Sequence, residues 1–412
     1  MKSQNKIAVL ILLLTTSVLM WIIPEIVKIA TISPTNYPFV YFSSKLKGLC
    51  LIDFSNKEYP MQDLKGNKYT TAQMDSLVPL FNFRQLMSEG LLPDSIDGVE
   101  INPRLLMSKT VVSHFSPSDF SVPKPALQGM LETMPLRGGL KTPNDLFRID
   151  NEIVFINAES NQVDEEKSQG FAQLLKKRGY QFPTKWAEGN ASTRKAYDEG
   201  YFCLDNANRL FHIKLVNGKP YVRDTKVSES INIDRFVSYN PSDKRFYGYI
   251  FSKEGDLFIL EPDSGAYVPH KLDMPRINFR EGQIMVMGNL LYWVVSVSDI
   301  HGKSYYAMHT ESLKLVEQHF IPREPHLWDK TKQFLMPFYI SMESYKTAYI
   351  YPMFHFSSMG AFILSGLLAI IAFFGCTRGC RTDERLFKVA LVALTGIAGM
   401  IAVLILPKFS KP

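Results

Sequence analysis

The sequence predicts a mainly β extracytoplasmic domain, a propeller-like array of short antiparallel strands with some helices, joined to three transmembrane α-helices, one N-terminal and two C-terminal. Two observations predict this fold class. Apolar segments lie at 7–23, 348–374 and 389–406, and each is close to the roughly 20 apolar residues that a helix needs to cross a bilayer core. Between them, residues 31–346 are largely polar and contain repeated strand-and-turn patterns.

Charges beside the apolar segments predict the orientation of the chain. Residues 1–6 contain two lysines and are expected in the cytoplasm, because positive charge is retained on that side. The loop at 376–388 is expected there too, since it is rich in cations: Arg378, Arg381, Arg385 and Lys388. The domain at 31–346 and the short tail at 407–412 are then expected outside. A cleaved signal peptide stays open as an alternative to an anchor at 7–23, although the apolar run is long for one.

Composition excludes few functions. The 46 basic and 40 acidic residues give only a mild positive excess, unlike the concentrated basic face of a nucleic-acid-binding protein, so no nucleic-acid partner is expected. Four cysteines in 412 residues are too few for a disulfide scaffold. A bond between Cys50 and Cys203 stays open, although Cys203 lies in an apolar strand pattern. Cys376 and Cys380 lack two further zinc ligands nearby and are expected to be inert.

A strand-and-turn pattern recurs three times in the middle domain, starting near Tyr201, Tyr249 and Met287. Each copy has an apolar strand, a turn with Gly, Asn or Asp, an aromatic strand, a second turn and another aromatic strand. Leu257 follows its counterpart Leu210 by 47 residues, near the period of a propeller blade, while the third copy comes sooner. A propeller-like array is therefore predicted, with an irregular β-sandwich as the alternative.

Helices are expected to interrupt the strands. Residues 164–179 have acidic residues in the first turn, basic residues in the last and a terminal glycine, as the helix dipole and C-cap favour. Residues 75–90 are a second candidate, although Pro79 limits its length. Residues 103–139 are rich in Pro and Ser without clear periodicity, which indicates a long surface excursion.

The best candidate for a binding site in the middle domain is the polar stretch that precedes the strand at Tyr201. Loops at the rim of a β-array often carry binding groups. The candidate residues are Asn190, Arg194, Lys195, Asp198, Glu199 and, on the next strand, His212. A turn with solvated charges is the plainer interpretation of the loop, and His212 alternates with apolar neighbours as a buried strand histidine would. No residue is assigned a catalytic role.

Two other pairs of residues resemble known kinds of site. Lys167 and Ser168 resemble a Ser–Lys nucleophile pair, but the lysine lies at a charged, solvated helix start rather than in an apolar pocket. His355 and Met359 lie four residues apart on the predicted second membrane helix and offer a weak copper or haem ligand pair. Apart from this pair, no metal or cofactor is expected.

Residues 142–214 carry motifs that resemble a known family. They include Pro143-Asn144-Asp145, Phe182-Pro183, Gly189-Asn190, Lys195-Ala196-Tyr197-Asp198-Glu199-Gly200-Tyr201 and Leu210-Phe211-His212. This set is similar to a family of membrane-anchored proteins from Bacteroides-type bacteria that is catalogued only as a domain of unknown function. The resemblance implies a Gram-negative inner membrane, a periplasmic domain and an association with ABC-type transporters. It carries no catalytic residue across.

The function expected from these observations is a non-enzymatic, membrane-anchored periplasmic binding or scaffold module, an accessory subunit of an ABC-type transporter complex whose other partner is the lipid bilayer. One alternative is a membrane-anchored, hydrolase-like enzyme that uses the Asp198 and Glu199 loop or a histidine from a late group: His301, His309, His319 and His326. Another is a signal-relay protein. Polar groups that converge in one concave pocket would favour the enzyme.

Overall fold

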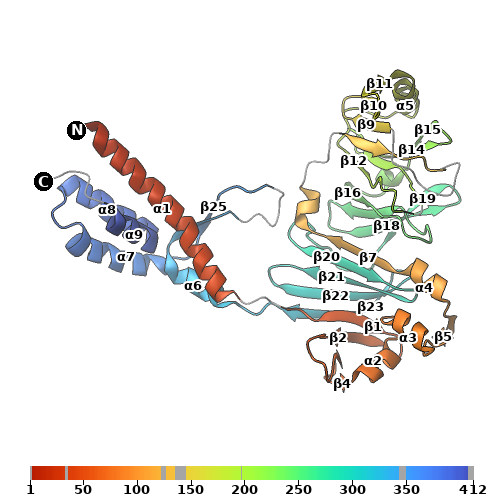
Figure 1. The fold of residues 1–412 in the computed structure, drawn as a ribbon, viewed down its shortest axis with the longest axis horizontal. Helices are drawn as coiled ribbons and strands as arrows, with labels where there is room; N and C mark the ends of the chain where they lie inside the picture. Colours follow the sequence, from red (N-terminus) through yellow and green to blue (C-terminus); the bar gives the residue numbers. More distant parts are fainter. Residues whose placement is uncertain are drawn as a thin grey trace. The chain divides into compact units, whose positions relative to one another are not determined.

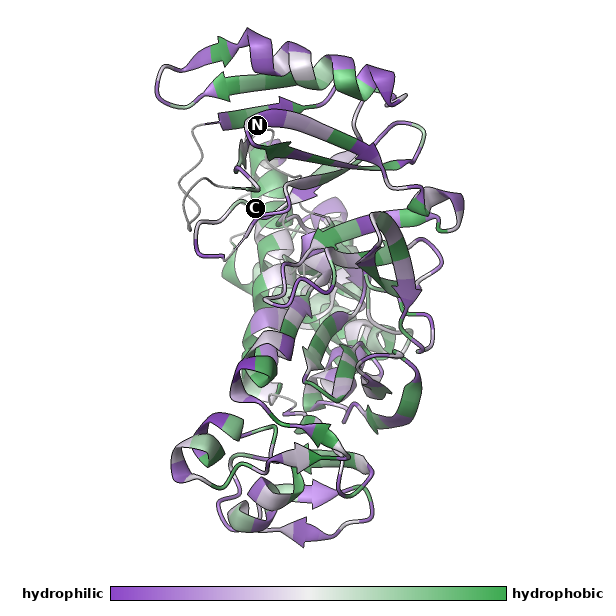
Figure 2. Ribbon diagram, turned by 90° about the vertical axis from the view of Figure 1, so that its right-hand side faces the viewer, coloured by the Kyte–Doolittle hydropathy of each residue, from purple (hydrophilic) through white to green (hydrophobic). Residues whose placement is uncertain are grey.

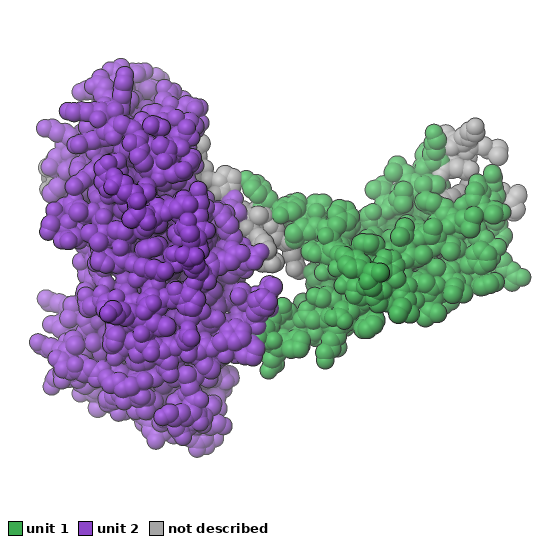
Figure 3. Space-filling model, turned by 180° about the vertical axis from the view of Figure 1, so that it is seen from behind, with its two compact units in different colours: residues 1–36, 323–412 green, residues 37–322 purple. Residues whose placement is uncertain are grey.

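A computed structural model describes most of the chain and divides it into two compact units. The described residues are 2–32, 36–121, 127–134, 145–195, 197–342 and 349–406. Unit 1 combines both ends of the chain, Met1–Asn36 and Arg323–Pro412, and unit 2 is the middle, Tyr37–Pro322 (Figure 3). The predicted domain at 31–346 is therefore longer than the compact middle unit, because the residues from Arg323 onward belong with the terminal helices.

Unit 2 is a mixed α/β structure dominated by antiparallel sheets of four or five strands (Figure 1). The first sheet contains β1 (Phe39–Ser43), β2 (Gly48–Ile52), β3 (Met61–Asp63) and β4 (Lys68–Tyr69). The second contains β8 (Gln128–Met130), β9 (Asp145–Ile149), β10 (Ile153–Asn157) and β11 (Gln162–Asp164). In both, each strand pairs with the next along the chain, so every connection within the described residues of a sheet is local.

The three predicted repeats form the remaining large sheets. The third sheet contains β12 (Trp186–Gly189), β13 (Tyr201–Leu204), β14 (Leu210–Val216) and β15 (Lys219–Asp224). The fourth contains β16 (Ile233–Ser238), β17 (Gly248–Ser252), β18 (Leu257–Asp263) and β19 (Ala266–Lys271). The fifth contains β20 (Gln283–Gly288), β21 (Tyr292–Ser298), β22 (Gly302–His309) and β23 (Leu315–Pro322), extended by β7 (Val111–Phe115) next to β20. The predicted repeats are confirmed as successive antiparallel sheets.

Neighbouring sheets bury shared apolar cores, and the strands of unit 2 carry both hydrophobic and hydrophilic residues (Figure 2). The second and third sheets share Phe147, Phe155, Phe211 and Ile213. The third and fourth share Phe202, Leu210, Phe236 and Ile250. The fourth and fifth share Phe251, Ile259, Trp293 and Val295. The fifth and first share Phe42, Leu49, Tyr292 and Tyr305. The sheets are thus joined in one series by side chains that alternate between the two faces of each strand.

Short helices join or cover the sheets. They are α2 (Thr71–Leu77), α3 (Phe83–Glu89), α4 (Pro103–Lys109) and α5 (Glu165–Lys177), with 3₁₀ turns at Pro117–Phe120 and Val227–Glu229; a small hairpin joins β5 (Ser95–Ile96) to β6 (Val99–Glu100). Helix α5 is confirmed, and the Asp164 side chain caps it by accepting the Lys167 N–H at 2.9 Å. The candidate at 75–90 becomes two helices, α2 and α3, separated around Pro79.

One expectation about unit 2 is corrected. Residues 103–139 are not a surface excursion, since their described part contains α4, β7 and β8 (Gln128–Met130), and β7 completes the fifth sheet.

The question of a disulfide, left open by the sequence, is answered. Cys50 and Cys203 are both buried and both free. They lie in different cores, one beneath the first sheet and one between the second and third, so no disulfide joins them.

Unit 1 gathers elements from both ends of the chain. They are α1 (Lys2–Thr31), α6 (Leu327–Leu335), the hairpin strands β24 (Phe338–Ser341) and β25 (Met353–Phe356), α7 (Ala361–Ile371), a π-helical turn (Ala372–Cys376), α8 (Thr382–Thr395) and α9 (Ile397–Ile405). Helix α9 packs on α1, and residues of α7 and α8 belong to the same buried cluster as Leu12 of α1, while β24 packs on α1 around Met20. Within α8, Glu384 and Lys388 form a buried ion pair of 2.8 Å.

One described helix, Lys6–Thr31 within α1, is long and apolar enough to cross a membrane, and a signal sequence would meet the same test. Three spans are therefore not supported. The expected helix at 348–374 is wrong in its first half, where β25 forms, and the apolar helix is the shorter Ala361–Cys376. The expected helix at 389–406 is broken at Gly396, whose φ of 60° and ψ of −129° suit glycine alone. The tail at 407–412 lies outside the described residues.

We expect Gly200→Ala to destabilise unit 2 far more than Gly218→Ala. Both glycines have φ near +70°, so alanine strains either backbone by about 1–2 kcal/mol. Around Gly218 a new Cβ meets nothing within 4 Å, whereas at Gly200 it would lie 2.4 Å from the Ile213 carbonyl oxygen. That clash should add about 1–3 kcal/mol. Denaturant unfolding of the full chain, followed by tryptophan fluorescence, measures the difference; equal losses would contradict this packing.

Candidate functional site

The predicted loop lies between β12 and β13, and Asp198 is fixed inside it. This carboxylate is buried. Its Oδ2 lies 2.6 Å from Nζ of Lys195, and its Oδ1 accepts the N–H of Gly200 at 2.7 Å. Both carboxylate oxygens therefore have partners at the entry to β13. Asp198 therefore stabilises the conformation of the loop, and it is not exposed as a binding group would be.

Glu199 and His212 are brought together by the pairing of β13 with β14. The ring Nε2 of His212 contacts the carbonyl oxygen of Glu199, and its Nδ1 lies 2.7 Å from the hydroxyl of Tyr267. A carbonyl can only accept, so Nε2 carries the proton and donates, and Nδ1 accepts from the tyrosine. The Glu199 carboxylate instead pairs with Lys214 at 2.7 Å.

The His212 ring is neutral across ordinary pH. Its side chain is fully buried, and Phe202 stacks on it with ring centres 4.2 Å apart and planes 7° apart. Burial, with the nearby positive charge of Lys214, lowers its pKa from 6.5 to about 3. The prediction of a buried strand histidine is confirmed by this burial. Its two ring nitrogens bond to the Tyr267 hydroxyl and the Glu199 carbonyl and so help to position both.

Three tyrosines surround this histidine, and we call Tyr221, Tyr247 and Tyr267 the tyrosine cluster. They are half-buried, and the hydroxyls of Tyr221 and Tyr267 lie 3.4 Å apart. Lys214 lies 5.3 Å from the ring centre of Tyr221, and Arg223 lies 5.6 Å from that of Tyr267. Burial raises the pKa of Tyr247 to about 12 and that of Tyr267 further, so both keep their protons.

The tyrosine cluster was not found from the sequence, because its members come from two sheets. Tyr221 belongs to β15 of the third sheet, while Tyr267 belongs to β19 of the fourth and Tyr247 directly precedes β17. Neither Asn190 nor Arg194 joins them; both are exposed, and no described side-chain contact links either to His212. The site that results offers hydroxyl groups, aromatic faces and two cations to a bound molecule.

The remaining candidates in unit 2 have structural partners. Ser168 accepts the Phe155 N–H at 2.9 Å and donates to the Asp164 carbonyl, while Lys167 pairs with Asp145. The serine and lysine therefore serve α5 and its sheet, as the plainer interpretation held.

The late histidines do not form one group. His301 and His309 flank β22 at opposite ends, roughly 25 Å apart at the rise of a strand. His319 faces Tyr305 across the β22–β23 pair, and His326 is the N-cap of α6 in unit 1. Among the described residues, no three His, Cys, Asp or Glu side chains are placed to hold a metal ion.

The weak possibility of a ligand pair at His355 and Met359 depended on a helix that does not form there. His355 lies in strand β25 instead of a helix, where its Nε2 lies 2.9 Å from Ser341 Oγ and Tyr339 stacks on its ring. Met359 lies beyond the strand and is exposed. A shared helix face, on which the ligand pair depended, does not exist. Cys376 and Cys380 are half-buried.

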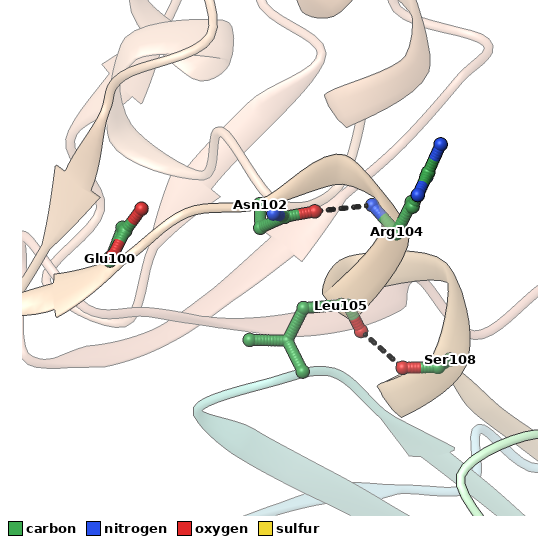
Figure 4. Close-up of a pocket in the computed structure, with 5 residues that line it drawn as sticks. All are labelled: Glu100, Asn102, Arg104, Leu105 and Ser108. Carbon is green, nitrogen blue, oxygen red and sulfur yellow. Dashed lines mark hydrogen bonds between the residues drawn. The ribbon is translucent and has the colours of Figure 1, made fainter.

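Two open hollows occur elsewhere on unit 2. One, of about 570 Å³, lies beside α4 and is lined by Glu100, Asn102, Arg104, Leu105 and Ser108 (Figure 4). The Asn102 side chain accepts the Arg104 N–H and Ser108 donates to the Leu105 carbonyl, so these groups serve the helix. The other, of about 460 Å³, lies between the β13–β14 turn and the start of β16. Neither contains the predicted loop.

Comparisons with known proteins identify a family model and weak structural likenesses. A model described as Domain of unknown function (DUF4857) matches residues 39–308. No curated protein matches the chain.

Three solved structures give measured likenesses. The β-propeller domain of Cps50 (Swd1) from Myceliophteria thermophila is 10% identical, with a TM-score of 0.26, over 48% of this chain and 57% of that one. The fission yeast SREBP-SCAP binding domains are 8% identical, with a TM-score of 0.29, over 78% and 79%. The Dos1 propeller is 8% identical, with a TM-score of 0.20, over 56% and 65%. This chain thus spans less than two thirds of two of them, and the scores are too low to argue from.

We expect His212→Gln to flatten the acid dependence of stability. In the wild type the histidine is protonated below about pH 6.5 only when unfolded, because its folded pKa is near 3. Its contribution is therefore complete above pH 6.5 and falls by up to about 1.4 kcal/mol per pH unit down to about pH 3. Glutamine keeps a donor and an acceptor without titrating. Unfolding at pH 7, 6, 5 and 4 compares the slopes, and parallel slopes would show that the buried ring is not the cause.

Proposed function

We propose that this chain, which belongs to the DUF4857 family of domains of unknown function, works as a non-enzymatic binding or scaffold module. In this proposal unit 2 is a propeller-like domain on the periplasmic side of a bacterial inner membrane. Unit 1 contains its anchor, α1 (Lys2–Thr31). The module serves as an accessory subunit of a membrane complex of the ABC-transporter type.

The observation that carries the proposal is that the charged and ring groups of Asp198, Glu199 and His212 are paired within the protein. His212 uses both ring nitrogens, Asp198 uses both carboxylate oxygens, and Glu199 pairs with Lys214. A general base must present a free lone pair to the proton that it removes. Side chains paired in this way hold the surface around the tyrosine cluster in one conformation. A surface with a fixed conformation suits the recognition of a partner.

The series of sheets supports the binding half of the proposal. Successive sheets that share cores place their turns along common rims, and loops at such rims carry contacts in many β-arrays. The tyrosine cluster lies where the third and fourth sheets meet. Half-buried tyrosines beside an exposed Arg223 resemble the composition of protein interfaces, where Tyr and Arg are enriched.

The anchor and the partner class have different support. Helix α1 turns large apolar side chains outward, among them Leu14 and Ile26, which are 58% and 60% exposed, and a bilayer would cover them. The periplasmic side, the inner membrane and the ABC-type partner rest on the resemblance of residues 142–214 given above.

We expect the tagged full-length protein, purified in a mild detergent, to retain a permease and an ATPase in fixed ratio. Arg223→Glu reverses an exposed charge at the tyrosine cluster and should lower their recovery several-fold. Arg148→Glu, at a guanidinium that is 56% exposed on the second sheet, is the matched control and should leave recovery unchanged. Quantitative mass spectrometry of the purified material measures both. Recovery of the wild-type protein alone would overturn the accessory-subunit proposal and favour the enzyme alternative.

A further inference from the structure

Helices α7 and α9 of unit 1 have mainly small residues inside and large apolar residues outside, and α8 between them also exposes large apolar residues. The buried positions include Ala361, Ser365, Ala369, Ala372, Ala398, Gly399 and Ala402. The exposed positions include Ile363, Leu367, Ile370, Phe374, Leu394, Leu404 and Ile405, each more than half exposed. A helical bundle in water shows the opposite pattern, with large apolar residues inside and polar ones outside. Small residues at helix contacts and large apolar ones around them are typical of helices in lipid.

The packing of α9 on α1 fixes the direction in which α9 runs. Ala398, near its start, packs with Met20 of α1. Ala402 and Val403, one turn later, pack with Leu12 of α1. Leu12 precedes Met20 by two helical turns, about 12 Å. Helix α9 is therefore antiparallel to α1 and leads back toward the side where α1 begins.

The directions of α7 and α8 relative to α1 follow from the same two clusters. Gly360, the N-cap of α7, lies beside Phe334 of α6, and the adjacent Leu335 packs against the cluster that contains Met20 of α1. Ala369 and Ala372, at the far end of α7, belong to the cluster that contains Leu12. Helix α7 thus runs toward the beginning of α1 as well. Helix α8 returns, because Val392 packs at the level of Leu12 and Gly396 follows beside Met336.

The chain reverses at Gly396 without a loop. At this glycine a Cβ would lie 2.9 Å from Ser365 Oγ. At Gly399, one turn into α9, a Cβ would lie 2.2 Å from Thr395 Oγ1, so the two helices approach closely. Helices α8 and α9 form a hairpin that enters and leaves on one side.

The positive charges of the α7–α8 connection lie on the same side as the beginning of α1. The connection between α7 and α8 follows Cys376, which packs in the same cluster as Leu12. It carries Arg378 and Arg381, and α8 continues with Arg385. These cations therefore lie toward the end of α1 that carries Lys2 and Lys6, and cations gather on the cytoplasmic side of membrane helices.

From this arrangement we infer that lipid acyl chains cover the outer faces of α7, α8 and α9, which lie in the bilayer beside α1, and that α8–α9 is a re-entrant hairpin. Helix α9 then ends on the side where α1 begins, whereas the topology expected from the sequence has it end on the outer side. The inference rests on the proposed function in one respect, namely that α1 spans the membrane. Helix α7 with its π-helical turn has 16 residues, about 24 Å, so it reaches across most of a bilayer core.

Reporters at the two ends of the full-length protein test the hairpin. A fluorescent protein that matures only in the cytoplasm and an alkaline phosphatase active only outside it are fused in turn before residue 1 and after residue 412. Protease added to spheroplasts reports the side of unit 2. We expect both ends to fluoresce and unit 2 to be cleaved.

The outcomes separate this inference from the proposed function. A fluorescent first end with phosphatase activity at the second overturns the hairpin and leaves the proposed anchor intact. Protection of unit 2 from protease overturns the proposed orientation. In that case, ends that report the same side still support the hairpin, and ends that report opposite sides overturn it.

We expect Leu367→Arg to reduce the yield of membrane-integrated protein several-fold, because this side chain is more than half exposed at the middle of α7 and would place a charge among acyl chains. Val163→Arg, at a half-exposed apolar residue of β11, is the matched control and should change the yield little. Carbonate-washed membranes are compared by immunoblot. Equal yields of the two variants would show that the outer face of α7 meets water and would overturn the lipid contact.

Discussion

The structure of unit 2 depends on sheets that are apolar on both faces. In β13, Phe202 and Leu204 face the fourth sheet, while Tyr201 and Cys203 face the second. A sheet of this kind loses stability if either face meets water, since each buried aromatic contributes about 2 kcal/mol or more. Each interior sheet therefore requires a neighbour on both sides. The sheets therefore pack in the order second, third, fourth, fifth and first. No single sheet in this series would be stable alone.

This constraint also determines what the sequence could predict. The third, fourth and fifth sheets were recognised because their hairpins are local and several of their turns have positive φ, at Asn217-Gly218 and Ser264-Gly265 in the third and fourth sheets and at Gly302 in the fifth. The first two sheets were missed because several of their strands have only two or three residues, among them β3, β4, β8 and β11. Such strands are too short to show an alternation of apolar and polar residues.

The C-terminal helices were misjudged for a different reason. Apolarity over about 20 residues predicts burial in lipid or protein, yet it does not predict an unbroken helix. The positive φ of Gly396 ends α8 and reverses the chain into α9. The sequence shows only that a glycine lies within an apolar run, which does not reveal its backbone conformation. Similarly, the sequence placed Asp198, Glu199 and His212 near one another because they are local, whereas Tyr267 reaches the same histidine from another sheet.

The hydrogen bond between His212 and Tyr267 links two sheets at the candidate site. It joins β14 of the third sheet to β19 of the fourth, across a boundary that is held mainly by apolar contacts. Apolar contacts are non-directional and tolerate small rotations of one sheet against the other, whereas a hydrogen bond between two rings specifies an orientation. Because the histidine stays neutral, that bond does not change with ordinary pH. The tyrosine cluster therefore lies over a boundary between two sheets whose relative orientation this hydrogen bond specifies.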